Sequence, residues 1–291
     1  MLTTLKIILK KYLPFYSFMR SIAFPYYEKK RSYKIQKMPE YGIGLFSCLG
    51  IKFPLYLSSS NGFVDEEIYW KGCYEEEVLE VLQKELPLAG TYVDIGSNIG
   101  QHALFASVIN PTGKVIAFEP VDKLYRQFLD SITANKLTNI TLHKKACGED
   151  EGQMKINFSE KNMGGASLVE ESNRESHETI SIMRGDTILI SEPRIDLIKV
   201  DTEGFELEVL RGILGTIRKH RPKLLIEYSP ILYSGQRTQN GALILELLEE
   251  ENYEVVTIDD GGKIHLTKNL TDLAKSYSDQ VNILCTPLLK K

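Results

Sequence analysis

The sequence of 291 residues predicts an α/β fold built on an open, mostly parallel sheet of seven strands with an antiparallel last strand. Three observations support this. Short runs rich in Val, Ile and Leu alternate with stretches of helical periodicity from residue 92 onward. A glycine turn at residues 96–100 joins the first run to the first helix. The last two runs, residues 253–258 and 281–285, are joined without a clear long helix, as antiparallel neighbours can be.

The first 38 residues predict a basic extension in front of this sheet. They contain nine Lys or Arg and one acidic residue, whereas the rest of the chain holds 26 basic and 38 acidic residues. Leu2, Leu5 and Leu9 share one helical face, but charges interrupt every apolar run, so none reaches the roughly 20 residues of a membrane span. Two interpretations remain: residues 1–38 contact an anionic membrane surface or a partner peripherally, or they form an ordinary helix packed on the body.

Residues 41–60 alternate around glycines, which predicts a small hairpin. Residues 75–86 predict a helix, because acids occupy its first turn and apolar residues recur at helical spacing. We therefore divide the chain into residues 1–70, the basic segment with its hairpin, and residues 71–291, the α/β domain.

The elements of the α/β domain follow from the alternation. Strands are predicted at residues 92–95, 114–118, 140–143, 195–200, 223–228, 253–258 and 281–285, and helices at residues 99–109, 121–135, 206–218 and 242–250. Residues 152–190 break this rhythm with β-like stretches at 153–158, 167–169 and 178–183. They predict an inserted hairpin or extra strands over the site.

The turn after the first strand is the first candidate binding site. Gly96 and Gly100 have no Cβ, so the backbone can turn sharply and approach a ligand, and Asn98 is the residue that best tolerates the left-handed conformation after glycine. The dinucleotide pattern Gly-x-Gly-x-x-Gly is absent, and the carboxylate of Asp94 precedes the first glycine. That carboxylate would repel a pyrophosphate and attract a sulfonium or an amino group. The turn therefore predicts S-adenosylmethionine (SAM), with these four residues around its methionine and sulfonium end.

Two further positions extend this cofactor site. Glu119 lies at the end of the second predicted strand, 25 residues after Asp94. An acid about 20 residues beyond such a turn binds ribose hydroxyls, although Glu119 could also be a simple acid at a helix N-terminus. Ala146 and Cys147 follow the third strand, where an adenine edge would lie.

A second polar cluster follows the fourth strand, at Lys199, Asp201 and Glu203, and Glu227 closes the fifth strand. The ligand crevice of an open sheet lies outside the carboxyl ends of its strands, so these carboxylates should share one cleft with Asp94. Lys199 lies in an otherwise apolar strand and therefore needs a partner, for which Asp201, Glu203 and Glu227 are candidates. The cluster could supply a general base, an ion-pair scaffold or a divalent-metal site on Asp201 and Glu203.

The composition excludes several classes of protein. A net charge of −4 gives no general attraction to nucleic acid, so no nucleic-acid partner is expected. Four scattered cysteines without a Cys-x-x-Cys pair predict reduced thiols and a cytoplasmic location, at a membrane surface if residues 1–38 bind one. Nothing in the sequence indicates the oligomeric state.

Five motifs, in order, resemble the FkbM family of SAM-dependent methyltransferases. They are Gly-Cys-Tyr-Glu at residues 72–75, Val-Asp-Ile-Gly-Ser-Asn-Ile-Gly at 93–100, Ala-Phe-Glu-Pro at 117–120, Gly-Gly with Ser-Leu within 164–168, and Ile-Lys-Val-Asp-Thr-Glu-Gly at 198–204. The resemblance implies a class I, Rossmann-like methyltransferase fold in which Tyr74 and Glu75 cover bound SAM. It also implies methylation of a hydroxyl, often on a sugar or a natural product, with substrate choice outside these motifs.

The sequence therefore predicts a SAM-dependent O-methyltransferase of a small-molecule or glycan acceptor. Methyl transfer is an in-line displacement, so positioning the acceptor oxygen is the main task. Asp201 or Glu203 would take the acceptor proton while Lys199 holds the pair, or the same carboxylates would bind a divalent metal. Two other classes remain as alternatives: a nicotinamide-dependent oxidoreductase or epimerase, and a non-catalytic binding or docking module of the same fold.

Overall fold

The computed structural model describes residues 29–159, 162–167, 176–232, 239–258, 264–266 and 280–288. The amphipathic stretch predicted at the start of the chain lies outside these residues. Within them, residues 29–35 are helical. No described helix has both the length and the apolar composition needed to cross a bilayer.

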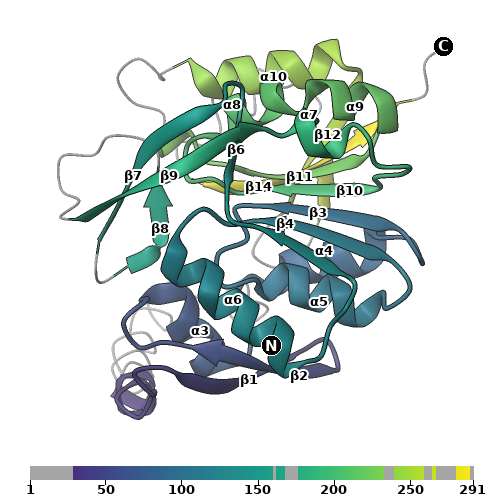
Figure 1. Ribbon diagram of the computed structural model, residues 1–291. Helices are drawn as coiled ribbons and strands as arrows, with labels where there is room; N and C mark the ends of the chain where they lie inside the picture. The colour runs from purple at the N-terminus through teal and green to yellow at the C-terminus, as the bar shows by residue number, and fades with distance from the viewer. Residues whose placement is uncertain are drawn as a thin grey trace, which may run out of the picture.

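The centre of the molecule is a sheet in the order β13-β12-β14-β11-β10-β3-β4-β5 (Figure 1). Its strands are β3 (Thr91–Ile95), β4 (Lys114–Phe118), β5 (Ile140–His143), β10 (Leu197–Val200), β11 (Lys223–Tyr228), β12 (Tyr253–Ile258), β13 (Ile264–Leu266) and β14 (Val281–Pro287). The seven predicted strands are confirmed, and β14 is antiparallel to both β11 and β12. The short edge strand β13 was not predicted from the sequence.

Helices cover both faces of this sheet. Figure 1 shows α4 (Glu76–Glu85), α5 (Gln101–Ile109) and α6 (Asp122–Ala134) on one side, and α8 (Glu206–Gly212), α9 (Leu214–His220) and α10 (Asn240–Glu250) on the other. The prediction of a single helix at residues 206–218 is wrong, because the helix is interrupted at Ile213. That residue leaves the helical range with φ −115° and buries its side chain completely.

Connections run outward in both directions from the middle of the sheet. From β3 the chain adds β4 and β5 on one side, whereas β10 pairs with the other side of β3 and continues to β11. The boundary between β3 and β10 is therefore the topological switch point, where open α/β sheets bind ligands.

A second sheet, in the order β6-β9-β7-β8, stands beside the first (Figure 1). It contains β6 (Ala146–Gly148), β7 (Gly152–Ser159), β8 (Asn162–Ser167) and β9 (Ser176–Arg184), and α7 (Asp186–Leu189) follows it. The extra strands expected between residues 152 and 190 are thus present. The stretch predicted at 167–169 is displaced to β8, and its last two residues lie outside the described part of the chain.

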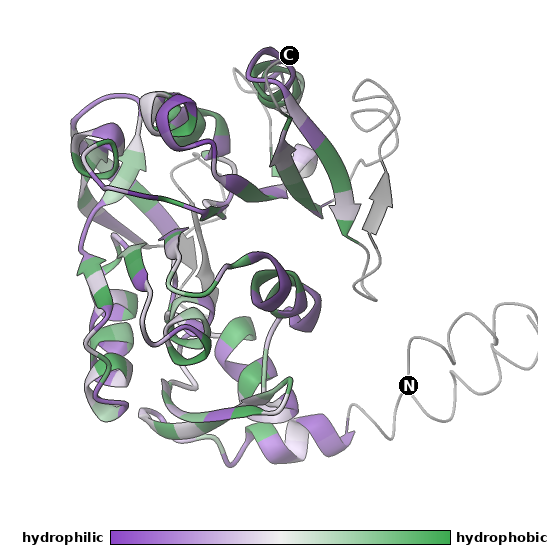
Figure 2. Cartoon of the chain, turned by 90° about the vertical axis from the view of Figure 1, so that its right-hand side faces the viewer, coloured by the Kyte–Doolittle hydropathy of each residue, from purple (hydrophilic) through white to green (hydrophobic). Residues whose placement is uncertain are grey.

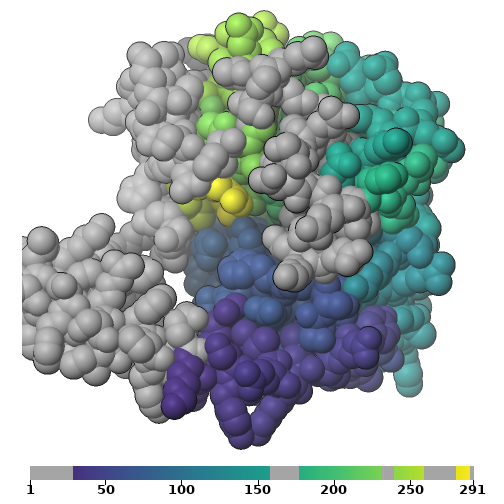
Figure 3. All heavy atoms as spheres, turned by 90° about the vertical axis from the view of Figure 1, so that its left-hand side faces the viewer, coloured from purple at the N-terminus to yellow at the C-terminus, as the bar shows by residue number. Residues whose placement is uncertain are grey.

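The hairpin predicted at residues 41–60 is β1 (Gly42–Cys48) with β2 (Ile51–Leu57), and α3 (Phe63–Lys71) follows. In Figure 3 these N-terminal residues, drawn in purple, form one end of the molecule. Phe46 of β1 stacks on Phe53 at 4.3 Å and meets Phe105 of α5 at 5.8 Å between ring centroids. The hairpin therefore shares its core with the α/β layer, and the division between residues 70 and 71 stays a sequence-based prediction.

Candidate active site

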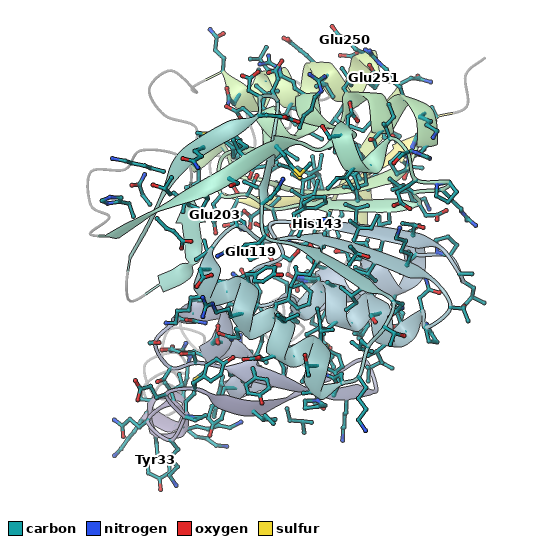
Figure 4. All side chains as sticks on the ribbon, in the orientation of Figure 1. Tyr33, Glu119, His143, Glu203, Glu250 and Glu251 are labelled. Atoms are coloured by element: carbon teal, nitrogen blue, oxygen red, sulfur yellow. The ribbon has the colours of Figure 1, made fainter. Side chains whose placement is uncertain are left out.

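A pocket lies at the carboxyl ends of β3, β4, β10 and β11, on both sides of the switch point. The predicted site residues that line it are Tyr74, Gly96, Asn98, Glu119, Ala146, Cys147, Asp201, Glu203 and Glu227. Figure 4 shows Glu119 and Glu203 near the same edge of the sheet, each beyond the carboxyl end of a strand. The predicted residues that do not line the pocket are Glu75, Asp94, Gly100 and Lys199.

Glu119 fixes the turn that follows β3. Its Oε2 accepts a hydrogen bond from Asn98 N at 2.8 Å, and its Oε1 accepts one from Val121 N at 2.9 Å. Burial raises the pKa of Glu119 to about 8, although the two N–H donors oppose the shift. Asn98 adopts the expected left-handed conformation, with φ 53°. A carboxylate that lines the pocket so close to the turn can accept hydrogen bonds from ligand hydroxyls.

The two glycines of the turn are required by contacts within the chain. Gly96 has φ +82°, and a Cβ there would lie 1.8 Å from the carbonyl oxygen of Asp201. Gly100 has φ +83°, and a Cβ there would lie 2.1 Å from the ring of Phe128. Contacts within the chain, with the loop after β10 and with α6, therefore require both glycines. The approach of this turn to a ligand stays a prediction.

A buried ionic layer lies next to the pocket. Lys199 is 3% exposed, faces Asp94 across the β10–β3 register, and places Nζ 2.6 Å from Asp201 Oδ2. This confirms Asp201 as the partner expected for Lys199. Burial lowers the pKa of Lys199, but the carboxylates of Asp201, Asp94 and Glu75 outweigh burial and raise it.

Two acids of this layer, Asp94 and Glu75, have raised pKa values. Burial raises the pKa of Asp94 to about 6 and that of Glu75 to about 7, and Lys199 opposes both shifts. Asn282 Nδ2 donates to Glu75 Oε1 at 3.3 Å. Asp94 and Glu75 therefore act on the pocket as buried neighbours of Lys199 and Asp201, a position that the sequence did not predict.

Glu206 organises the loop after β10. Its Oε1 accepts hydrogen bonds from Thr202 N at 3.1 Å, Thr202 Oγ1 at 3.1 Å and Gly204 N at 3.0 Å. These bonds hold Glu203 in a left-handed conformation, with φ 53°, between two anchored neighbours. Sequence reasoning gave Glu206 no role, because its three hydrogen bonds arise only once the loop folds back over the start of α8.

Tyr74 is held over the pocket by a residue that sequence reasoning also missed. Tyr74 N donates to Gln101 Oε1 at 2.7 Å, and Gln101 Nε2 donates to Tyr74 O at 2.8 Å. One side-chain amide therefore satisfies both backbone groups of Tyr74. Phe63 of α3, half exposed, meets the Tyr74 ring edge-to-face at 5.9 Å.

Three pocket carboxylates could hold a divalent cation. One oxygen from each of Asp201, Glu203 and Glu227 lies within 4.8 Å of the others. Burial, together with the charges of Asp201 and Glu203, raises the pKa of Glu227 well above its ordinary value. Glu227 also accepts hydrogen bonds from Gln280 and, at 3.4 Å, from Ser229 Oγ.

The chemistry of the lining fits SAM. Four acidic side chains and one lysine, Lys145, line the pocket. The carboxylates of Asp201 and Glu203 suit a ligand that carries a sulfonium and an ammonium group. Apolar side chains of β4 and β7, Phe118 and Ile156, also line the pocket and suit a flat adenine ring. The switch-point pocket, the sheet order and this acidic lining together define a class I methyltransferase.

Comparison with known proteins gives the family. The Methyltransferase FkbM domain matches residues 94–255, more than half of the chain, so the chain belongs to the FkbM methyltransferase family. SAM is accordingly its cofactor.

Individual relatives are distant. The chain is 25% identical over 172 residues to Methyltransferase 1 of Beauveria bassiana (52% of this chain, 66% of the relative). It is 30% identical over 146 residues to the hexuronic acid methyltransferase AglP of Haloferax volcanii (50% of this chain, 58% of the relative). The matches thus span less than two thirds of the length of either relative.

Solved structures are also similar to the chain. They include the methyltransferase FkbM of Methylobacillus flagellatus KT (17% identity, TM-score 0.41, 76% of this chain and 54% of that chain). Another is SMU.1697c of Streptococcus mutans in complex with SAH (12% identity, TM-score 0.44, 73% and 97%).

Proposed function

We propose that the protein transfers the methyl group of SAM to a hydroxyl of a sugar, a glycan or a natural product. The observation that carries this proposal is the convergence of Asp201, Glu203 and Glu227 on the pocket that Glu119 also lines. A hydroxyl acceptor loses a proton as it attacks, so it needs a base beside the methyl donor. A pocket with several carboxylates supplies such a base.

Glu203 is the proposed base. Asp201 is tied to Lys199 at 2.6 Å, which stabilises its anion and leaves it as an orienting group. The pKa of Glu227 is raised well above its ordinary value by burial, so this side chain tends to keep its proton and positions its neighbours. Glu203 would accept the acceptor proton on a carboxylate oxygen while Lys199, behind Asp201, favours the developing negative charge.

Bound SAM supplies an activated methyl group, and the chain has to align the acceptor oxygen with it. Phe63 offers an exposed ring beside Tyr74 on the side of the pocket lined by Val64. An aromatic ring of this kind gives an apolar face for a sugar or a natural-product ring. One relative is a hexuronic acid methyltransferase by name, which supports an acidic sugar among the acceptors to be tried first.

Glu203→Gln tests the base. With saturating SAM and a hydroxyl-bearing acceptor found by mass spectrometry of a sugar panel, we expect turnover to fall by about 10²–10⁴-fold. The affinity for SAM should change little, and Glu254→Gln, an exposed acid on β12, serves as the matched control. Unchanged turnover in Glu203→Gln would remove Glu203 from this role.

Other outcomes would select the alternatives. Loss of activity after dialysis against a chelator, restored by Mg²⁺, would assign Asp201, Glu203 and Glu227 to a cation. Tight binding of SAH with no methylated product from any acceptor would favour a non-catalytic module. Thermal stabilisation by NAD rather than SAM would favour the oxidoreductase or epimerase.

A further inference from the structure

One end of the molecule exposes apolar and basic side chains together. Tyr33, Tyr41, Ile43 and Leu45 are four of the nine large apolar side chains exposed among the described residues, and each is at least 48% exposed. They fall within thirteen consecutive positions. Residues 29–45 also carry five Lys or Arg against one Glu. In Figure 2 the helix of residues 29–35 and the β1–β2 hairpin lie together at this end.

The basic helix is fixed to the body. Arg31 Nη2 lies 3.1 Å from Glu66 Oε2, and its Nε lies 3.3 Å from Glu67 Oε1. Lys34 Nζ donates to Trp70 O at 2.9 Å and lies 5.2 Å from the centre of the Trp70 ring. These contacts with α3 hold the helix in one orientation. Figure 4 shows Tyr33 pointing away from the body there.

Several lysines remain available on this helix. Lys29, Lys30 and Lys37 are exposed and form no ion pair with a carboxylate of the described residues. Lys37 Nζ lies 4.3 Å from the centre of the Tyr33 ring, so charge and aromatic surface are presented as one unit.

The hairpin adds an apolar face. Ile43 and Leu45 share one face of β1, since side chains two apart in a strand point the same way, and the opposite face turns toward the core. Ile43 pairs with Tyr56 and Leu45 with Pro54 across the register, and the exposed Lys52 pairs with Ser47. We call this the hairpin-end surface and define it by Lys29, Lys30, Tyr33, Lys37, Ile43, Leu45 and Lys52.

We propose that the hairpin-end surface docks on an anionic lipid bilayer. Lysines near a negatively charged membrane are attracted to it, and Ile and Leu side chains between them can enter the headgroup boundary. Beyond residue 38 the chain holds 26 basic and 38 acidic residues. The rest of the molecule is therefore repelled by the same membrane. The two effects together orient the molecule with the hairpin-end surface toward the bilayer.

The charge of this surface argues against a second copy of the chain as its occupant. Two facing copies would bring together the four lysines of this surface in each copy, Lys29, Lys30, Lys37 and Lys52, with no acidic residue among the residues that define it. A polyanion without an apolar phase would use the lysines but leave Ile43 and Leu45 in water.

Vesicle cosedimentation of the full chain tests the proposal. We expect binding to phosphatidylcholine vesicles that contain roughly one-third phosphatidylserine, and at least about tenfold weaker binding to pure phosphatidylcholine. Lys29→Glu with Lys30→Glu should weaken binding to the anionic vesicles by at least about tenfold, as should Ile43→Ser with Leu45→Ser. The matched control is Lys155→Glu with Lys219→Glu, on β7 and α9, which should bind like the parent.

Thermal melting and SAM affinity of each variant show that it is folded, and neither depends on the proposed methyl transfer. Equal binding of all variants to anionic vesicles would overturn the proposal, because attachment would then lie outside residues 29–52. The proposal would also be overturned if Lys29→Glu with Lys30→Glu weakened binding but Ile43→Ser with Leu45→Ser did not. A dimer that these serine variants dissolve, with no vesicle binding, would also overturn it.

Discussion

The carboxyl edge of the sheet and the hairpin end use charge in opposite ways. Glu119 and Glu227 in the pocket and Lys199 beside it are each no more than 4% exposed, and their interactions act in a poorly solvated layer. At the hairpin end, Lys29 and Lys30 are exposed and screened by salt. The difference teaches that a few buried charges can define a ligand site, whereas surface charges act only in numbers and with apolar neighbours.

The largest expected effect contrasts two lysines. Lys199→Met leaves Asp201, Asp94 and Glu75 without their buried counter-charge and should lower the free energy of unfolding by about 3–5 kcal/mol. Lys29→Met should change it by no more than about 0.5 kcal/mol. Urea unfolding measures both. Similar losses in the two variants would mean that the buried layer does not depend on Lys199.

The next contrast is between two glycines of similar conformation. Gly96 and Gly50 have φ +82° and +79°, but a Cβ at Gly50 meets nothing within 4 Å, whereas one at Gly96 would collide with Asp201 O. Gly50→Ala should cost about 1 kcal/mol from backbone conformation alone. Gly96→Ala should cost about 2–4 kcal/mol and weaken SAM binding. Calorimetric melting and SAM titration check this, and equal costs would show that the β3 turn can shift freely.

A pH series tests the buried acids through a smaller expected effect, on ligand affinity. The raised pKa values of Asp94, about 6, and Glu119, about 8, mean that both acids are largely protonated at about pH 5 and ionise as the pH rises. Ionised acids attract the sulfonium of SAM, which SAH lacks, so the preference for SAM over SAH should grow by about tenfold from about pH 5 to about pH 8.

Calorimetric titration of both ligands measures that preference, and Asp94→Asn should reduce its dependence on pH. Glu246→Gln, a change on α10 outside the residues that line the pocket, is the control. A preference that is independent of pH in the parent would contradict an electrostatic role for the buried acids.

The smallest expected effect is that of salt on the pocket. Raising the salt concentration from about 0.05 M to about 0.3 M should change the affinity for SAM by less than about twofold, because buried charges are weakly screened. Over the same range, binding to anionic vesicles should fall by about tenfold or more. An equal loss of SAM affinity and of vesicle binding with salt would show that the charges of the two regions are screened alike.

The central sheet could be predicted because its strands are runs of mostly apolar residues buried on both faces. All five residues of β3 are buried, and so are all four residues of the neighbouring β10, including Lys199. The conformation of Asn98 and the Lys199–Asp201 pair could also be predicted, since each depends on local rules of backbone conformation or of buried charge. These parts of the site follow from chemistry that a short stretch of sequence contains.

Other parts depend on distant contacts. The helix α3 has no strong apolar stripe, and its Asp65 instead accepts hydrogen bonds from Ser58 N and Gln127 Nε2, both at 2.7 Å. The roles of Gln101 and Glu206 depend on where Tyr74 and the β10 loop come to lie. The sequence shows that Asp94 is near the end of a strand, but whether its side chain lines the pocket or the buried layer depends on the packing of β10.

The amide of Gln101 has a consequence for the catalytic cycle. Because it ties down both the N–H and the carbonyl of Tyr74, the segment between α3 and α4 cannot lift as a flap without breaking two bonds at once. The phenol ring of Tyr74, which lines the pocket, can rotate without breaking either bond. We expect this ring, rather than the backbone of Tyr74, to move when a ligand enters or leaves.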